Sequence, residues 1–276
     1  MKKEQAAPEL RVPPVAEGID QWIIMGLDPS LSRTGYAFMH VGRIPFESGT
    51  QARWLDVGSL KPEDASVPVW VRSKSIALTL RKHLEELLNS FVVRNVVAKT
   101  GLIISLEAPT PQNDFLISIS RILHLVLLDM DFKRFGIDRV QVQMTNASTL
   151  RSLMGLTKQG ASNKVENVAK AYSYLDQGKY PNLDTDACDA VLMAMMARYS
   201  AAILLGSPES VPLRFLTAMC NATEEVVGKG RNARTRIKGI LHRREYWVRY
   251  ERRNYDVLLR DAKTKKARLD RISFSI

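Results

Sequence analysis

The sequence predicts one α/β domain with three layers, covering about residues 22–205, and a basic extension after it. Short apolar runs of strand length come first, and beyond them such runs alternate with segments of helical spacing. Most of the excess positive charge lies outside this pattern, in the last quarter of the chain. A stretch rich in serine and proline at 207–212 is the predicted boundary between the two parts.

The first part of the domain is predicted to be a meander of three strands. Residues 23–27 form a short apolar run that contains one glycine and ends on Asp28. A short turn with a proline, two serines and an arginine leads to the second strand at 35–41. A third, partly alternating strand is expected at 52–60.

Helices and strands alternate in the rest of the domain. Between 69 and 91 the apolar residues lie on one broad face of a helix, with charged residues opposite. The segment 115–132 is apolar nearly all round, which is typical of a helix that is buried or packs against a partner. The other expected elements are strands at 102–107 and 140–144 and helices at 147–154, 163–175 and from about 185 onward.

The formal net charge of +11 is unevenly distributed. Residues 211–276 hold 17 lysines and arginines against 7 acids, whereas the first 210 residues are close to neutral. A basic segment attached to a nearly neutral domain indicates a polyanionic partner, most often nucleic acid. The aromatic residues interleaved with this charge favour base stacking, or a small core, over a merely solvated tail. We therefore expect the extension 206–276 to bind nucleic acid.

The composition excludes several classes of protein. Two cysteines cannot form a disulfide framework and lack the spacing of metal ligands, which favours a reducing compartment. No apolar run reaches the roughly 18 residues that a membrane span needs. Residues 1–21 are polar and contain no apolar signal segment. We expect a mobile N-terminal tail, a cytoplasmic location and no membrane partner.

Four acids occur where a carboxylate needs a partner. Asp28 and Glu107 end two predicted strands, and ligands bind at such strand ends in open α/β sheets. Asp186 and Asp189 stand three residues apart at the start of the last core helix, so they share one face. Taken singly, each has an ordinary explanation. Asp28 would cap its turn and Asp186 its helix, while Glu107 would pair with an arginine. Asp189 would be a surface acid.

The combination of these acids is more specific than its parts. Carboxylates that converge repel one another strongly unless cations lie between them. Hard divalent cations that prefer oxygen ligands, Mg²⁺ or Mn²⁺, are the natural partners. Two such ions, roughly 4 Å apart, clamp both oxygens of an in-line displacement at phosphorus. The four acids therefore predict a centre for two Mg²⁺ or Mn²⁺ ions.

The arrangement resembles the RuvC-type Holliday junction resolvases of the RNase H-like (retroviral integrase) superfamily. IIMGLDPSLSRTGYAF resembles the first strand and hairpin of that family, LIISLEAP its second acidic strand, and DACDAVLMAMMARY its final helix with paired acids. STLRSLMGLTKQGASNKVENVAKAY resembles the segment in which a lysine opens a helix, here Lys164. The four segments occur in the expected order over about 22–205.

The resemblance implies an α/β, RNase H-like three-layer fold with a central mixed five-stranded sheet flanked by helices. It also implies a crossover junction endodeoxyribonuclease of DNA recombination and repair. Such an enzyme cuts four-way or other branched DNA with two metal ions and without a small-molecule cofactor. The ions would be held by Asp28, Glu107, Asp186 and Asp189. Lys164 would contact the phosphate or position the water, and a solvated lysine at a helix start is the alternative.

Further residues are candidates for contacts with nucleic acid. Backbone contacts, which position without reading sequence, are expected from the turn residues Ser30, Ser32, Arg33 and Thr34. Phe115 is the nearest candidate for the aromatic residue with which resolvases open the junction centre. Arg151 lies close to the place of the family's basic residue before the glycine loop. The candidates in that loop and in the extension are Lys158, Arg231, Arg234, Arg236, Lys238, Arg243 and Arg244.

A homodimer is the expected assembly, because the approximate two-fold symmetry of a four-way junction suits a symmetric pair of cuts. The family dimerises through the helix that corresponds to 115–132, and burial in the core is the alternative. The loop after Glu107 departs from the family, Asp184 could replace one of the paired acids, and 206–276 lies outside the family core. These departures indicate a divergent member, such as a phage-borne one, in the cytoplasm of a bacterial or phage-infected host cell.

Three other functions stay open from the sequence. A nuclease of the same fold could process RNA, RNA–DNA hybrids, or replication and packaging intermediates. A catalytically inert nucleic-acid-binding module is the second, because acids at these positions can be structural. An ATP-binding protein of the actin or hexokinase type is the third. It requires a second phosphate loop and a glycine-rich adenosine-binding segment, and we find neither in the sequence.

Overall fold

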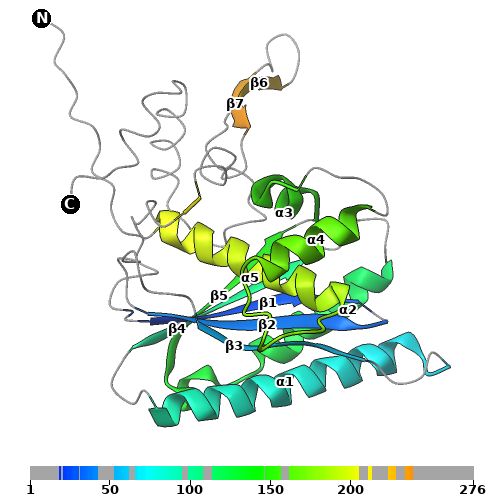
Figure 1. The fold of residues 1–276 in the computed structure, drawn as a ribbon, viewed down its shortest axis with the longest axis vertical. Helices are drawn as coiled ribbons and strands as arrows, with labels where there is room; N and C mark the ends of the chain where they lie inside the picture. The colour runs from blue at the N-terminus through cyan, green and yellow to red at the C-terminus, as the bar shows by residue number, and fades with distance from the viewer. Residues whose placement is uncertain are drawn as a thin grey trace, which may run out of the picture.

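A three-layer α/β domain and a second, two-stranded sheet make up the described part of the chain (Figure 1). The computed structural model describes residues 19, 21–30, 32–42, 53–61, 66–94, 99–107, 114–145, 147–156, 162–204, 211–212, 223–227 and 234–238. The expected mixed five-stranded sheet with helices on both faces is confirmed.

The central sheet has the strand order β3-β2-β1-β4-β5. Its antiparallel half is the expected meander of β1 (Gln21–Asp28), β2 (Thr34–Val41) and β3 (Arg53–Leu60). In the other half, β4 (Thr100–Glu107) pairs parallel with β1, and β5 (Ile137–Thr145) pairs parallel with β4. β1 is the middle strand, and all eight of its residues are buried. This burial on both faces explains why its sequence is a nearly continuous apolar run.

Three helices cover the face of the sheet that carries the candidate acids: α3 (Ala147–Met154), α4 (Ser162–Tyr172) and α5 (Thr185–Leu204). α5 lies along β1 and β2, with α3 and α4 beyond it (Figure 1). The core on this side joins alternate residues of the strands, such as Trp22 and Ile24, to Val191 and Met195 of α5. Successive strand residues point to opposite faces, so the neighbouring positions belong to the other layer.

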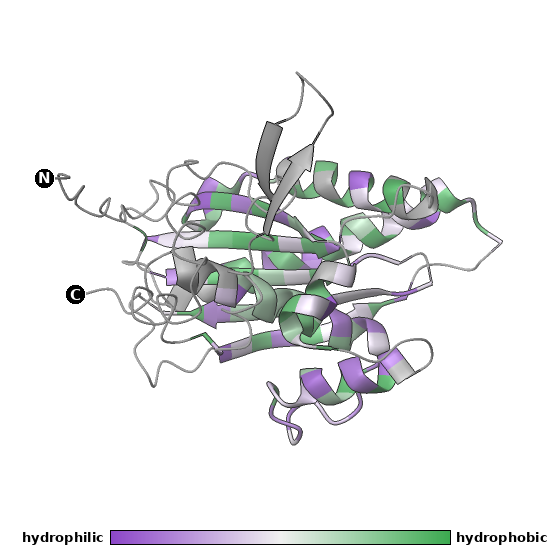
Figure 2. Ribbon diagram, turned by 90° about the horizontal axis from the view of Figure 1, so that it is seen from above, coloured by the Kyte–Doolittle hydropathy of each residue, from purple (hydrophilic) through white to green (hydrophobic). Residues whose placement is uncertain are grey.

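The opposite face is covered by α1 (Val69–Arg94) and α2 (Asp114–Leu128). Here Ile23, Met25 and Leu27 of β1 pack with Leu80 of α1 and Leu123 of α2. Hydrophobic residues predominate along the central strands, whereas hydrophobic and hydrophilic residues are mixed along the outer strands and the helices (Figure 2). The two faces of β1 therefore supply the centres of two separate hydrophobic cores.

Two helices end earlier than the sequence predicts. The helix expected at 115–132 ends at Leu128, and a 3₁₀ helix, η1 (Phe132–Phe135), follows after a turn. Phe132 and Phe135 of η1 are both buried and stand three residues apart. In the sequence, this spacing looks like a continuation of the apolar pattern of α2, which is why the helix was expected to run to 132. The helix expected at 163–175 ends at Tyr172 and continues as turns.

The extension contains an antiparallel hairpin that the sequence reasoning did not place. β6 (Thr223–Val227) pairs with β7 (Arg234–Lys238). Each strand has only five residues, and β6 has two adjacent acids followed by two adjacent valines instead of alternating, so the sequence gives a weak strand signal. Among the helices of the described ranges, none has the length and apolar character needed to cross a membrane.

Two glycines let α5 lie directly on the sheet. A Cβ atom at Gly26 of β1 would overlap the carbonyl oxygen of Ala190, and one at Gly35 of β2 would overlap the carbonyl oxygen of Asp186. Both obstacles are helix backbone, which cannot turn aside as a flexible side chain can. The contact between strand and helix is therefore one of backbone against backbone, and it fixes the height of α5 above the sheet.

We expect Gly35→Ala to destabilise the protein by about 2 kcal/mol or more, because overpacking a tight contact forces the backbone to shift. Urea unfolding of the full chain measures this. Gly178→Ala is the matched control, because a Cβ there would meet only the Asp176 side chain, with its Oδ1 at 3.3 Å. Equal stability of the two variants would contradict the close approach of α5.

Candidate functional site

The four candidate acids lie at one end of the face that α5 covers. Asp28 and Glu107 are the last residues of β1 and β4. These strands pair in parallel with Leu27 beside Leu106, so the two acids are neighbours across the sheet. Asp28 also pairs with Gly35 of β2, and the backbone of Asp186 lies directly over this glycine. The first turn of α5 thus stands above the two strand ends.

Asp28 is the most enclosed of the four acids, with 9% of its surface exposed. Burial raises the pKa of Asp28 well above its usual value, and the charges of Glu107, Asp189 and Asp186 raise it further. A side-chain hydrogen bond with Glu107 is one of the causes that raise the pKa of Asp28. Asp28 therefore lies within the electrostatic reach of the other three acids, and its role as a metal ligand stays a prediction.

The pKa values of the two acids of α5 are also raised. Burial raises the pKa of Asp189 to about 6, and the charges of Glu107 and Asp186 act in the same direction. Burial also raises the pKa of Asp186, together with the charge of Asp184. The structure therefore brings carboxylates from β1, β4 and α5 into one electrostatic neighbourhood, and it holds them there at a cost in free energy.

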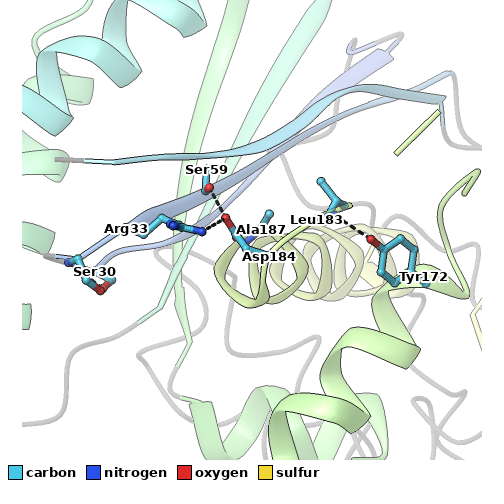
Figure 3. A network of polar contacts seen from close by, with 8 residues as sticks. Ser30, Arg33, Ser59, Tyr172, Leu183, Asp184 and Ala187 are labelled. Atoms are coloured by element: carbon cyan, nitrogen blue, oxygen red, sulfur yellow. Dashed lines mark hydrogen bonds and ion pairs between the residues drawn. The ribbon is translucent and has the colours of Figure 1, made fainter. Parts of the chain in front are cut away.

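Asp184, not Asp186, caps α5. Its Oδ1 accepts a hydrogen bond of 2.9 Å from the backbone N–H of Ala187, three residues on. Its Oδ2 accepts hydrogen bonds from Ser59 of β3 and from Arg33, the latter at 2.7 Å (Figure 3). These donors hold the pKa of Asp184 below its usual value although burial acts against them. Asp184 is thus occupied as a cap and ion-pair partner, and Asp186 remains free for the acid cluster.

The turn after Asp28 is held by its own side chains. The hydroxyl groups of Ser30 and Ser32 are hydrogen-bonded at 2.9 Å, and Thr34 donates to the Ser30 carbonyl oxygen at 3.0 Å. Arg33 reaches across to Asp184 at the start of α5 (Figure 3). Contacts of these four residues with nucleic acid stay a prediction. What the structure adds is that the turn is tied to the helix carrying the acid pair.

Helix α4 presents two polar side chains to the acids of α5. The charge of Lys164, an exposed residue, partly offsets the rise in the pKa values of Asp186 and Asp189. Three residues on, Asn167 donates a hydrogen bond of 2.7 Å from Nδ2 to Oδ1 of Asp189. Residues at i and i+3 share a helix face, so the pair Lys164 and Asn167 opposes the pair Asp186 and Asp189. Sequence reasoning missed Asn167, although this spacing could have indicated it.

Arg151 points into the domain from α3. Its guanidinium donates to Oδ1 of Asn167 at 3.0 Å and forms an ion pair with Glu166, with Nη2 and Oε2 3.4 Å apart. Its contact with nucleic acid stays a prediction, and the observed role is to hold α3 against α4. Phe115 lies on α2, and three further candidates occupy alternate positions of β7: Arg234, Arg236 and Lys238. The side chains of these four, and the whole of Lys158, Arg231, Arg243 and Arg244, lie outside the described residues.

The donor set suits hard divalent cations. Four carboxylates supply only oxygen ligands, and three of them have raised pKa values that a bound cation would relieve. Thr145, beside Glu107 in the next strand, adds a fully buried hydroxyl for which no hydrogen-bond partner is found. As the side chains lie, no three His, Cys, Asp or Glu residues among the described ones form a group that could hold an ion. Cation binding at these carboxylates therefore requires their side chains to rearrange.

A second polar cluster lies at the edge strand β3, outside the predicted site. His83 of α1 contacts Asp56, with Nε2 and Oδ2 2.6 Å apart, and Asp56 raises the pKa of this histidine. The two residues line a pocket of about 470 Å³ that also includes Arg53 and Lys179. None of the candidate acids lines this pocket. The histidine–aspartate contact fastens α1 to the edge strand.

Comparisons with known proteins give likeness in structure only. No protein-family model matches the chain, and no protein of assigned function matches it in sequence. It is similar to Thermus thermophilus RuvC in complex with a Holliday junction substrate, with a TM-score of 0.41 and 17% identity over 64% of this chain and 94% of that one. A second T. thermophilus RuvC structure gives a TM-score of 0.40 and 13% identity over 64% and 95%.

The human cytomegalovirus terminase nuclease domain is also similar, with a TM-score of 0.33 and 15% identity over 66% of this chain and 85% of that one. Likenesses at this level of identity and TM-score say nothing about function.

We expect Asp189→Asn to stabilise the metal-free protein at pH 8. The folded state keeps the Asp189 proton up to about pH 6, whereas an ordinary aspartate loses it near 3.8. Folding stability therefore falls as the pH rises through this window, and the substitution removes the loss. Urea unfolding with a chelator should show a gain on the order of 1 kcal/mol at pH 8 that shrinks toward pH 4.

Asp129→Asn is the matched control for this charge removal, because the Asp129 side chain is 83% exposed. It should change stability by less than about 0.5 kcal/mol at either pH. A loss of stability in Asp189→Asn at pH 8 would mean that the ionised Asp189 does not destabilise the folded state.

Proposed function

We propose that this chain is a divalent-metal-dependent nuclease that hydrolyses phosphodiester bonds in branched DNA. The convergence of Asp28, Glu107, Asp186 and Asp189 supports the proposal most directly. These acids come from three elements far apart in sequence, and folding brings them together against their mutual repulsion. Such an arrangement costs stability, and cation binding is a function that offsets the cost.

The acids would hold two ions from two sides. Asp28 and Glu107 approach from the sheet, and Asp186 and Asp189 approach from the first turn of α5. When bound, the ions supply the Lewis acidity that activates a water molecule and stabilises the leaving oxygen. Because a ligating carboxylate must be ionised, cation binding would release any proton that Asp28 holds.

Lys164 is the residue that we propose contacts the substrate phosphate. Its side chain is exposed, and its charge is felt by Asp186 and Asp189. An ammonium group beside an anionic site attracts phosphate oxygens and neutralises part of their charge. Lys164 would therefore orient the scissile phosphate over the acids rather than serve as a ligand.

Branched DNA and a homodimer are the finer parts of the proposal. The four sequence segments that resemble the RuvC-type resolvases support a junction substrate, and the basic residues of 206–276 support a polyanionic partner. On α2, Ile119, Leu123 and Leu127 enter the core, while Leu125 is 67% exposed. One apolar side chain on the outer face of α2 is therefore available for a two-fold contact.

The decisive experiment compares cleavage of a synthetic four-way junction, a linear duplex and an RNA–DNA hybrid, with Mg²⁺ and with a chelator. We expect paired symmetric cuts in the junction alone. Asp28→Asn, which keeps the size of the side chain, should lower the rate by more than about 100-fold because a ligand is lost. Asp129→Asn, a matched substitution of an exposed acid, should cut like the wild type.

Other outcomes would redirect the proposal. Cutting of the hybrid or of every substrate would keep the acid centre and assign another nucleic acid. Junction binding without cleavage under either Mg²⁺ or Mn²⁺ would leave an inert binding module. Normal cleavage by Asp28→Asn would remove Asp28 from the centre.

A further inference from the structure

A chain of hydrogen bonds runs from α3 through α4 to Asp189, the candidate acid on α5. Arg151 of α3 donates from Nη1 to Oδ1 of Asn167 of α4 at 3.0 Å. Asn167 in turn donates from Nδ2 to Oδ1 of Asp189 of α5 at 2.7 Å. Glu166, next to Asn167, holds the same guanidinium by an ion pair. The side chain of Asn167 is thereby bonded at both ends.

The chemistry of the neighbours fixes the direction of the Asn167 amide. A guanidinium can only donate hydrogen bonds, and an ionised carboxylate can only accept them. The amide must therefore turn its oxygen to Arg151 and its NH₂ group to Asp189. If the amide were flipped, its NH₂ group would face the Arg151 guanidinium, donor against donor. Its oxygen would face the Asp189 carboxylate, acceptor against acceptor. Arg151 thus determines which group of Asn167 faces the acid.

The hydrogen bond from Asn167 constrains the orientation of the Asp189 carboxylate, which the charges of its other neighbours do not define. Glu107 and Asp186 repel the charged form of Asp189. Lys164 attracts this charge, but an exposed lysine with a flexible stem does not define an orientation. The short bond to Asn167 occupies Oδ1 and leaves Oδ2 for a ligand. Partners that orient ligating carboxylates in this way tune metal affinity.

We propose that Asn167, held by Arg151, is a positioning residue that fixes the orientation of the Asp189 carboxylate for cation binding. The cation-binding part rests on the proposed function, whereas the fixed orientation of Asp189 does not. Asn167 itself need not touch a metal ion or the substrate. Its contribution is to keep Asp189 in one rotamer, so that binding a cation does not require the carboxylate to be ordered first.

The test uses Asn167→Leu, which keeps the approximate size of the side chain and removes both hydrogen bonds. Val168→Ala is the matched control, because Val168 packs from the same helix against the core and is the next residue along the chain. It loosens α4 without removing the bond to Asp189. Calorimetry measures the affinity of each full-length protein for Mn²⁺ alone, and crystal structures of the metal-free proteins show the Asp189 rotamer.

We expect Asn167→Leu to bind Mn²⁺ 10- to 100-fold more weakly than the wild type, the usual effect of losing a partner that orients a ligand. We expect Val168→Ala to stay within about twofold, since it leaves that partner in place. The Asp189 side chain should occupy one rotamer in the wild type and in Val168→Ala, and more than one in Asn167→Leu. Should the leucine variant fail to fold, Asn167→Ala removes the same bonds with a residue that favours helix.

Two results would overturn the proposal. The first is wild-type Mn²⁺ affinity, or an unchanged Asp189 rotamer, in Asn167→Leu. The second is an equal loss of affinity in Val168→Ala, which would assign the effect to the packing of α4. If the wild type itself binds no Mn²⁺, the proposed function fails, and the Asp189 rotamer in Asn167→Leu still decides whether Asn167 positions this acid.

Discussion

The direct contact of α5 with the central sheet is the constraint on which the rest of the structure depends. Gly26 and Gly35 remove the side chains that would keep the helix away, and their positions are matched to Ala190 and Asp186. With a larger residue in either strand, α5 would stand higher and its acids would leave the neighbourhood of Asp28. The packing of α4 and α3 follows from the same contact, because both helices pack in the core that α5 forms with the sheet.

Two aspartates near the start of α5, Asp184 and Asp189, have opposite electrostatic environments. Asp184 is surrounded by donors, from Arg33, Ser59 and the Ala187 backbone, and its charge is stabilised. Asp189 is buried among other acids, and Asn167 is the donor that reaches it from the described part of the chain, so its charge is disfavoured. The fold thus separates an acid that anchors the helix from acids that are poised for a ligand. Arg33 belongs to both environments, because it pairs with Asp184 and its charge also favours the ionised form of Asp186.

The sequence predicts the strands and most helices, because buried strands are short apolar runs and helices show their spacing. It also places Asp28 and Glu107 at strand ends and Asp186 and Asp189 near a helix start, as the structure has them, whereas their joint role as metal ligands stays a prediction. The cap at Asp184 was not predicted although the helix start near 185 was, because Asp184 and Asp186 each stand one residue from that start. Asn167 was missed because an asparagine in a helix has no distinctive chemistry until Arg151 and Asp189 flank it. The η1 segment was missed because its buried phenylalanines continue the helical spacing of α2. The hairpin of β6 and β7 was missed because its strands are only five residues long and β6 does not alternate.

The order of the elements along the chain has a consequence for biosynthesis. The ribosome releases β1 to β5 before α5, and N-terminal parts of a protein can begin to fold first. Until α5 follows, the sheet face that carries Trp22 and Ile24 lacks its main cover, and Asp28 and Glu107 lack half of their cluster. A nascent chain of this protein is therefore both prone to aggregate and without its complete acid centre. Any activity that needs all four acids begins only after the last helix of the domain has left the exit tunnel and docked.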